Sequence, residues 1–236
     1  MDKHLSPHTA DIIEGYLGAT TRHRGERKAR RFTATVTGPK PSASANAKVK
    51  RYALETPALT LQSLPNVFSA DRLDGGSRLL LSRLGQLDPA QELVDLACGN
   101  GVLGLAAIAV GVSQSATFCD ESAMAIESAR RNWAGLQATT SVRAKVRFHH
   151  GDGLLELDAM PDLVLCNPPF HQHHVVDEHA GQRLLRQCAG KLQPGGRLLL
   201  VANRHLNYLP LLRRYFARVE LLTEDNRFVV WQAFAG

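Results

Sequence analysis

The 236-residue sequence has no apolar run of the roughly 18 residues that a membrane-spanning helix requires, and it has only four cysteines. No apolar stretch follows Met1–His4, so we expect neither a transmembrane span nor a signal peptide. Cys98, Cys119, Cys166 and Cys188 form no C-x-x-C pair. This spacing favours free thiols in a reducing, cytoplasmic compartment over a disulfide framework.

Most of the chain also lacks net charge. The sequence has 28 Lys+Arg and 22 Asp+Glu, of which the first sixty residues hold 11 and 5, so residues 61–236 hold 17 of each. Basic runs attract phosphate groups, and the alternative is an ordinary solvated surface. We interpret the basic run of this first segment as an RNA contact formed by Arg22, Arg24, Arg27, Lys28, Arg30 and Arg31.

A glycine-rich turn follows the apolar run Glu92–Leu96. Gly99, Gly101 and Gly104 match G-x-G-x-x-G, a pattern that nicotinamide-nucleotide sites share. Asp95 precedes the turn, and its carboxylate would repel a pyrophosphate but attract a cation such as the amino group of S-adenosylmethionine. The sequence therefore favours S-adenosylmethionine over a nicotinamide cofactor, and a turn that only packs a helix on a strand is the plain alternative.

Acidic residues follow the next two expected strands. The run Ser115–Cys119 ends at Asp120 and Glu121, about 20 residues beyond the glycines, where a carboxylate commonly binds ribose hydroxyls. The run Val146–His149 leads to Asp152, which could accept a hydrogen bond from an adenine amino group. Each acid could instead cap a helix. Their order after the glycine turn favours cofactor contacts.

The string Asn167-Pro168-Pro169-Phe170 follows the apolar run Asp162–Cys166. Two prolines cannot continue a strand, so the chain must turn at its carboxyl end, where open α/β sheets bind ligands. The Asn167 side-chain oxygen and the Pro168 carbonyl can accept hydrogen bonds from an amine, and the Phe170 ring can stack on a base. The string predicts a site that holds a planar, amine-bearing group.

Two further positions are candidates for contact with a nucleic acid. The string His171-Gln172-His173-His174 lacks a spacing that would aim three side chains at one ion, so we expect no metal. His171 is a candidate for stacking on RNA, with plain exposure as the alternative. Arg204 follows a later strand and is a candidate phosphate contact.

The motifs Asp95–Gly101 and Asn167–Phe170 together resemble the class I S-adenosylmethionine-dependent methyltransferases of exocyclic amines. The strings Asn66–Ser69 with Leu73-Asp74, and Val201–Leu206, are similar to those of the ribosomal RNA guanine-N2 methyltransferases, in particular the large-subunit (23S) type. The resemblance spans Asn66 to Gly236.

The resemblance implies that Asn167, Pro168, Pro169 and Phe170 hold the target guanine. It also implies a cofactor site formed by Asp95, Gly99, Asn100, Gly101, Asp120, Glu121, Asp152, Gly153 and Asn167. Members of the family resemble two methyltransferase-like halves, and the residues before Asn66 are too few for the first half. A truncated chain lacking that half and a naturally short member both stay open.

Apolar runs alternate with helical patterns from Asp74 onward, which indicates a mostly parallel sheet covered on both faces. Only Thr223–Arg227 separates the last two strands, so these should form an antiparallel hairpin. We predict an α/β fold with a doubly wound, seven-stranded, mostly parallel Rossmann-like sheet in residues 66–236. Residues 1–65 should form a helix, the basic segment and a linker. The strands centre on Val94, Phe118, Phe148, Val164, Leu199, Leu221 and Val229.

Three functions remain open at this point. The preferred one is methylation of guanine N2 in ribosomal RNA. The short string N-P-P-F is also found in methyltransferases of adenine N6 and of protein glutamine, so either substrate is possible. A non-catalytic RNA-binding module that keeps the fold is the third.

Overall fold

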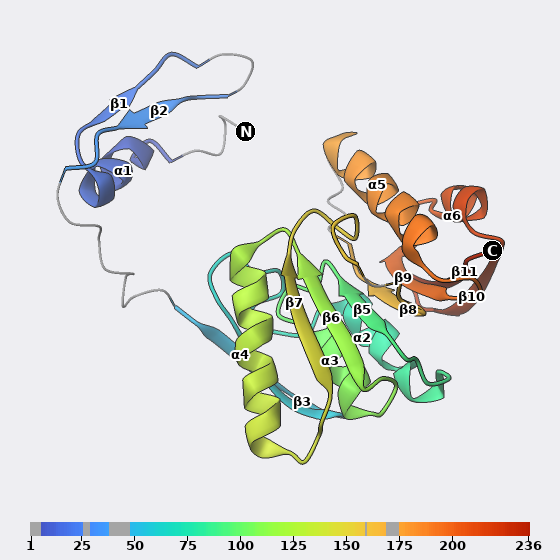
Figure 1. Ribbon diagram of the computed structural model, residues 1–236. Helices are drawn as coiled ribbons and strands as arrows, with labels where there is room; N and C mark the ends of the chain where they lie inside the picture. The colour runs from blue at the N-terminus through green and yellow to red at the C-terminus, as the bar shows by residue number, and fades with distance from the viewer. Residues whose placement is uncertain (1–5, 26–28, 38–47, 159, 169–174) are drawn as a thin grey trace. The chain divides into compact units, whose positions relative to one another are not determined.

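The seven apolar runs pair into one sheet in the computed structural model, which describes residues 6–25, 29–37, 48–158, 160–168 and 175–236 (Figure 1). The strand order is β10-β11-β9-β8-β5-β6-β7. The five strands from β9 to β7 are mutually parallel, β11 pairs antiparallel with β9, and β10 pairs antiparallel with β11. The strands are β5 (Leu93–Leu96), β6 (Ser115–Asp120), β7 (Lys145–His150), β8 (Leu163–Cys166), β9 (Arg197–Asn203), β10 (Arg218–Glu224) and β11 (Phe228–Phe234).

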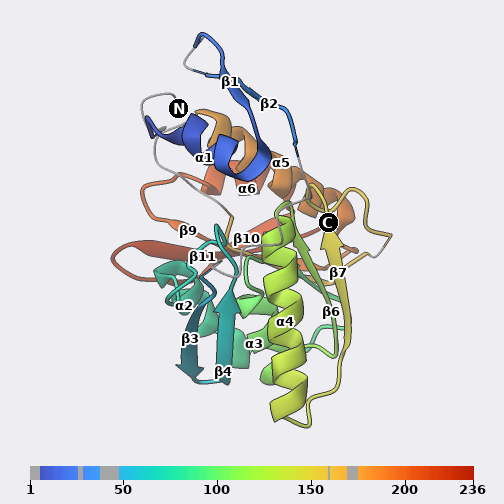
Figure 2. The same cartoon turned by 90° about the vertical axis from the view of Figure 1, so that its left-hand side faces the viewer.

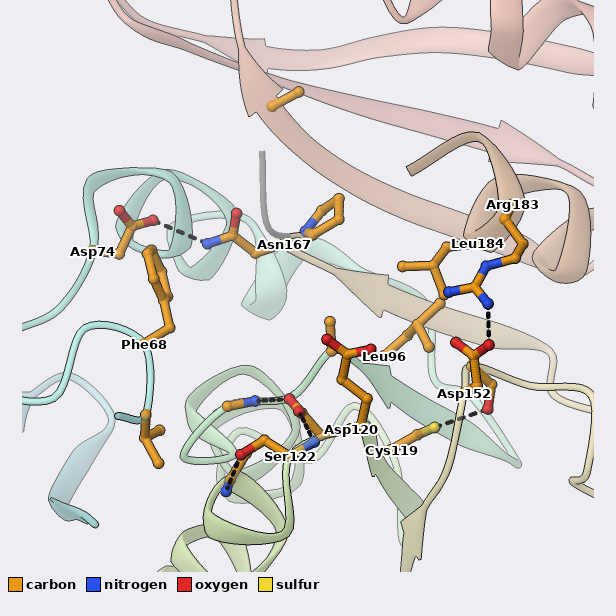
Figure 3. Close-up of a pocket in the computed structure, with 18 of the residues that line it drawn as sticks. Phe68, Asp74, Leu96, Cys119, Asp120, Ser122, Asp152, Asn167, Arg183 and Leu184 are labelled. Carbon is orange, nitrogen blue, oxygen red and sulfur yellow. Dashed lines mark hydrogen bonds and ion pairs between the residues drawn. The ribbon is translucent and has the colours of Figure 1, made fainter. Parts of the chain in front are cut away.

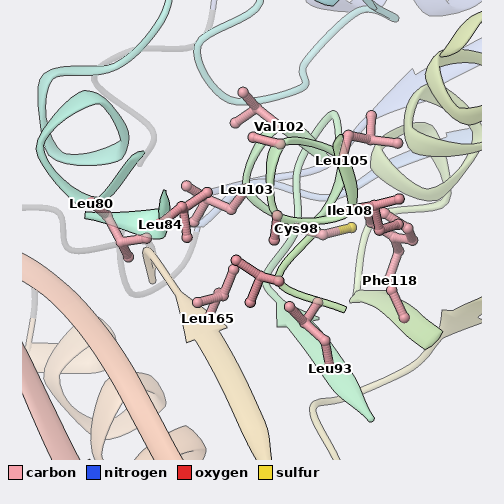
Figure 4. Packing of buried hydrophobic residues seen from close by; sticks show 14 of the residues in the cluster. Leu80, Leu84, Leu93, Cys98, Val102, Leu103, Leu105, Ile108, Phe118 and Leu165 are labelled. Atoms are coloured by element: carbon pink, nitrogen blue, oxygen red, sulfur yellow. The ribbon is translucent and has the colours of Figure 1, made fainter. Parts of the chain in front are cut away.

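Helices cover both faces of this sheet, as Figures 1 and 2 show. On one face, α2, α3 and α4 bury a cluster that includes Leu80, Leu103, Phe118 and Leu165 (Figure 4). On the other face, α5 and α6 pack on alternate residues of the same strands, among them Val164. The helices are α2 (Gly75–Leu81), α3 (Val102–Ala109), α4 (Ala123–Thr139), α5 (Val175–Lys191) and α6 (Leu209–Tyr215). The predicted doubly wound α/β fold is confirmed.

A hairpin that the sequence did not predict precedes the sheet. β3 (Lys50–Glu55) and β4 (Ala58–Ser63) pair antiparallel, and β4 lies along α4 (Figure 2). Leu59 and Leu61 of β4 are buried in the same cluster as α3 and α4. The compact unit that contains the sheet therefore runs from Lys48 to Gly236, and the boundary expected at residue 65 falls inside it.

The other compact unit, Met1–Ala47, is small. It contains α1 (Thr9–Leu17) and a short antiparallel pair, β1 (Thr20–Arg22) with β2 (Phe32–Ala34). None of its described residues is buried, so it has no core comparable to that of the sheet. The expected linker, residues 38–47, lies outside the described part of the chain. Among the described residues of both units, no helix has the length and apolarity needed to cross a bilayer.

Candidate functional site

A cavity of about 440 Å³ opens beyond the carboxyl ends of β5, β6, β8 and β9. The strand order reverses at this edge, because β6 follows β5 on one side and the chain crosses from β7 to β8 on the other side of β5. Open α/β sheets bind ligands at such a point. Figure 3 shows Asp120 and Asp152 on one side of it, and Asp74 and Asn167 on the other. We call these the glycine end (Gly99, Asp120, Asp152) and the amide end (Asp74, Ser77, Asn167). The predicted site residues that line it are Gly99, Asp120, Glu121, Asp152, Gly153, Asn167 and Pro168.

The two glycines of the loop after β5 have different roles: Gly99 leaves space at the cavity, and Gly101 allows close packing. Gly99 has a φ of +56°, and a Cβ there would meet no atom within 4 Å, so its backbone can face a ligand closely. Gly101 has a φ of +83°, and a Cβ there would lie 3.0 Å from Ala129 Cβ and 3.2 Å from the Phe118 ring. Gly101 does not line the cavity, and it allows α3 to start against α4 and β6.

Asp95 lies behind the loop rather than on the cavity. Its side chain is fully buried, and Oδ2 accepts a hydrogen bond from Gly104 N at 2.8 Å. Burial raises the pKa of this carboxyl well above its ordinary value, and the Gly104 bond only partly opposes that shift. The predicted contact with a ligand amino group is therefore not supported, because β-strand alternation turns Asp95 toward α3.

Asn100 likewise faces away from the main cavity. Its Nδ2 donates hydrogen bonds to Tyr52 Oη and Ser63 Oγ, both at 3.1 Å, and its Oδ1 accepts one from Val102 N. Asn132 Nδ2 donates to the backbone carbonyl oxygens of Asn100 and Gln62, both at 2.9 Å. Asn100 thus joins the loop to the β3–β4 hairpin, and its predicted cofactor contact stays a prediction.

Asp120 fixes the loop from the end of β6. Its Oδ2 accepts a hydrogen bond from Gly99 N at 2.9 Å, and its Oδ1 accepts one from Ser122 N at 2.8 Å. Ser122 then caps α4 by accepting from Ala125 N. The carboxylate remains on the cavity wall with Glu121 beside it. The two acids therefore lie where the sequence placed a ribose contact.

Asp152 lines the cavity but carries an ion pair with Arg183 of α5 (Figure 3). The next residue, Gly153, has a φ of +81° and accepts a hydrogen bond from Cys119 Sγ at 3.0 Å. Burial, followed by the charge of Asp120, raises the pKa of Cys119 to about 12. The thiol on this wall is therefore neutral at physiological pH, and Asp152 is the group here that can accept a ligand's hydrogen bond.

The amide end is held by side chains far apart in the sequence. Asn167 Nδ2 donates hydrogen bonds to Asp74 Oδ2 and Ser77 Oγ, both at 2.9 Å. Asp74 also caps α2 by accepting from Ser77 N at 3.0 Å. Because both contacts take the amide nitrogen, the Asn167 oxygen is left as an acceptor at the cavity. Asp74 had been noted only as part of the motif Leu73-Asp74 and had received no role.

Several predicted contacts fall elsewhere or outside the described residues. Pro169, Phe170 and His171 lie outside the described part of the chain, as do Arg27 and Lys28. Arg204 does not line the cavity, because its guanidinium contacts Glu224 at 3.6 Å and the Asp225 carbonyl at 3.1 Å.

Other cations take different positions. Arg227, which the sequence reading had not singled out, lines the cavity instead of Arg204. In the small unit, Arg22, Arg24 and Arg31 are exposed and Arg30 is half-buried. A search of the described residues finds no group of three or more His, Cys, Asp or Glu that could hold a metal.

Comparison with known proteins was made for both sequence and structure. Residues 58–232 match the family model of the methyltransferase small domain. The chain is 42% identical over 238 residues to "Ribosomal RNA large subunit methyltransferase G" of Ectopseudomonas mendocina and 39% identical over 233 residues to the protein of that name in Alcanivorax borkumensis. These alignments cover 99% and 98% of this chain but 61% and 58% of the relatives, so the chain spans about three-fifths of their length.

Among solved structures, a Thermus thermophilus (T. Thermophilus) 16S rRNA N2 G1207 methyltransferase in complex with AdoMet and guanosine has a similar fold. The TM-score is 0.74 at 24% identity, over 96% of this chain and 60% of that one. An O-methyltransferase family protein from Burkholderia thailandensis matches at a TM-score of 0.53 and 16% identity, over 66% of this chain and 55% of that one. At these identities the likeness shows the fold alone.

Proposed function

This chain belongs to the family of methyltransferase small domains, and we propose that it transfers a methyl group from S-adenosylmethionine to the N2 amine of a guanine in ribosomal RNA, that of the large subunit. The single observation that carries this proposal is the fixed amide of Asn167. Asp74 and Ser77 hold its nitrogen, so its oxygen is presented to the cavity as an acceptor. An amine is the group that such an acceptor selects.

The glycine end fits S-adenosylmethionine by its chemistry. A cavity of about 440 Å³ is in the range of small-molecule sites. Gly99 leaves open space for a ligand, and the carboxylates of Asp120 and Glu121 suit ribose hydroxyls and a positively charged ligand. When bound, S-adenosylmethionine supplies a methyl group that its cationic sulfur has already activated for transfer to a nucleophile.

The residues of the amide end have a positioning role in this reaction. The lone pair of guanine N2 is delocalised into the ring, so the enzyme must bring the amine into line with the methyl carbon at about 3 Å and exclude water. The Asn167 oxygen and the Pro168 carbonyl would orient the amine through its two N–H groups and stabilise positive charge as it develops on nitrogen. The nitrogen then releases one proton to solvent.

A guanine inside a duplex cannot reach this cavity, so the target base must be unpaired or flipped out. The exposed Arg22, Arg24 and Arg31 of the small unit are proposed to bind RNA phosphates. Two relatives that this chain matches over nearly its full length carry names that state methylation of large-subunit ribosomal RNA, which supports this substrate. Four buried, unpaired cysteines agree with the proposed cytoplasmic location.

Analysis of nucleosides tests the reaction directly. Unmodified 23S ribosomal RNA is incubated with the protein and S-adenosylmethionine, digested and examined by mass spectrometry. We expect N2-methylguanosine, and N6-methyladenosine or an unmethylated digest would refute the proposal. Isothermal titration should show binding of S-adenosylmethionine but not of NAD. The acids of the glycine end would attract the positive charge of S-adenosylmethionine and repel the pyrophosphate of NAD.

The RNA contact is tested by salt dependence. Replacing Arg22 and Arg24 with Gln should reduce the slope of log affinity against log salt by about 1.5, since each phosphate contact contributes about 0.7–0.9. The matched control replaces the exposed Arg143 and Lys145 of the sheet unit with Gln and should leave the slope unchanged. Equal slopes for both variants would show that the small unit's cations are only solvated surface.

A further inference from the structure

Asp74 is placed to do more than cap a helix. One oxygen, Oδ2, is fully occupied, because it accepts hydrogen bonds from Ser77 N at 3.0 Å and from Asn167 Nδ2 at 2.9 Å. No donor among the described residues bonds to the other oxygen, Oδ1, and Asp74 lines the cavity. Figure 3 shows the carboxylate beside Asn167, with only one of its two oxygens in the contact. Asn167 and Asp74 are thus in contact on the cavity wall, and each has one side-chain oxygen, Oδ1, to which no described donor bonds.

Guanine carries donors that match two neighbouring acceptors. Its exocyclic N2 amine has two N–H groups, and the adjacent ring atom N1 carries a third. Adenine also has an exocyclic amine, but its adjacent N1 is an unprotonated acceptor. A carboxylate oxygen beside the amine clamp would therefore bond to guanine and repel the lone pair of adenine.

We propose that Asp74 selects guanine at this site, with Oδ1 accepting the N1–H of the target base while Asn167 accepts from N2. This assignment rests on the proposed function and deepens it. It supplies the discrimination that the string Asn167–Phe170 cannot supply, since an amide oxygen accepts equally from the amine of adenine or guanine. Asp74 is then a specificity-determining residue, held in place by α2.

Helix capping alone does not account for the carboxylate. Ser, Thr and Asn cap helices about as well as Asp, and each would bond to Ser77 N. The additional feature that only an ionised Asp provides is a second oxygen with no proton to donate. Asp74 lines the cavity together with Asn167.

Asp74→Asn separates the two roles of this side chain. The amide oxygen of Asn can still accept from Ser77 N and Asn167 Nδ2, because both partners are donors. Its Nδ2 must then take the position of Oδ1 and becomes a donor toward the cavity. The variant thus keeps the cap and the Asn167 contact while it reverses the hydrogen-bond polarity at the base.

The substrate probe is a short unpaired RNA with either guanine or 2-aminopurine at the target position. 2-Aminopurine keeps the 2-amine but has an unprotonated N1. The wild-type protein should methylate the guanine RNA with a kcat/KM about 100-fold higher, as one or two lost base hydrogen bonds predict. In Asp74→Asn this ratio should fall at least about tenfold, mainly because guanine becomes a poorer substrate while 2-aminopurine gains a donor for N1.

Ser77→Ala is the matched control. It removes the other partner of Asn167 Nδ2 at Oγ but leaves the Asp74 carboxylate and the Ser77 N–H in place. Both RNAs should be methylated more slowly by the same factor, so the ratio should not change. If Asp74→Asn and Ser77→Ala shift the ratio equally, or if neither shifts it, Asp74 acts only by positioning Asn167 and the assignment is overturned.

Failure of this assignment differs from failure of the proposed function. A wild-type protein that methylates both RNAs equally refutes the role of Asp74 while methylation of N2 stands, and this result needs no variant to fold. A wild-type protein that methylates an adenine RNA instead refutes both. Thermal unfolding and S-adenosylmethionine titration of Asp74→Asn show whether a loss of activity reflects loss of the fold.

Discussion

At the glycine end of the cavity, a side chain bonds to backbone N–H groups 21 and 2 residues away, whereas at the amide end two side chains from segments 93 residues apart bond to each other. Asp120, at the end of β6, accepts hydrogen bonds from the backbone N–H groups of Gly99 in the loop after β5 and of Ser122. Asn167 instead depends on Asp74, which caps α2, and on Ser77, which lies in α2. The glycine end therefore depends on hydrogen bonds to the backbone, and the amide end depends on contacts between side chains, which substitutions can change one atom at a time.

Asn167→Ala tests the amide end and should have the largest effect. It removes the acceptor for the amine, so turnover should fall about 10²- to 10³-fold, as for loss of one transition-state hydrogen bond. The affinity for S-adenosylmethionine should change less than about threefold, because the variant leaves the carboxylates of the glycine end in place. A threefold change corresponds to a smaller free energy than the loss of one charged hydrogen bond. Steady-state kinetics and calorimetric titration measure the two.

The control for this variant is Asn203→Ala, which makes the same chemical change on another wall of the cavity. No described side chain holds the Asn203 amide, so we expect a smaller loss of turnover. Full activity in Asn167→Ala would contradict the role of the amide end.

Asp120→Ala tests the glycine end and should act on binding rather than turnover. It leaves Gly99 N and Ser122 N without their acceptor and removes a carboxylate from the cavity. The dissociation constant for S-adenosylmethionine should rise about 10- to 100-fold. At saturating cofactor the rate should recover most of its wild-type value. A loss of rate that saturation does not restore would mean that the two ends are not separable.

Two glycine variants separate ligand access from packing within the loop. Gly101→Ala requires a left-handed backbone and places a methyl group 3.0 Å from Ala129 Cβ, so the free energy of unfolding should fall by about 2–4 kcal/mol. Gly99→Ala meets no atom within 4 Å, so its stability should fall by only about 1–2 kcal/mol. Its methyl group should instead weaken cofactor binding about tenfold. Denaturant unfolding measures the stability of each variant, and titration measures its cofactor affinity. If Gly99→Ala lost more stability and Gly101→Ala lost more affinity, the two roles would be wrongly assigned.

Asp95→Asn should have the smallest effect on binding. Asp95 does not line the cavity, so cofactor affinity should change less than about threefold, whereas a lost ionic contact would cost about tenfold or more. The raised pKa of Asp95 should be visible in stability. As pH rises above 3.8 the unfolded chain releases this proton first, so the free energy of unfolding falls until the folded carboxyl also ionises. The variant should lose less stability over that interval.

Much of the fold could be predicted because the central parallel strands are mostly apolar runs. Val94, Val164 and Leu199 are buried in strands β5, β8 and β9 that helices cover on both faces. Residues directly after such runs must lie at one edge of the sheet, so Asp120 and Asn167 could be placed near a common cavity without knowledge of any contact.

The remainder depended on contacts that strand order alone does not specify. The β3–β4 hairpin was missed because it lies almost wholly within residues 1–65, which the sequence pattern assigned to a helix, the basic segment and a linker. The position of Asp95 next to the loop suggested a contact with the ligand. The face of β5 from which its side chain projects decides what it contacts, and that face carries α3. Asp74 has a recognisable capping position, yet its contact with Asn167 exists only once α2 packs on the sheet.

The burial of all four cysteines has a practical consequence for probing this molecule. Cys98, Cys119, Cys166 and Cys188 are at most 5% exposed, and burial raises the pKa of each thiol. The thiolate is the nucleophile that attacks a maleimide, so the native protein should react very little with these reagents. A single cysteine in place of Arg24, or in place of Arg227 at the cavity, would therefore carry a fluorophore or spin label selectively. No native cysteine would need to be removed.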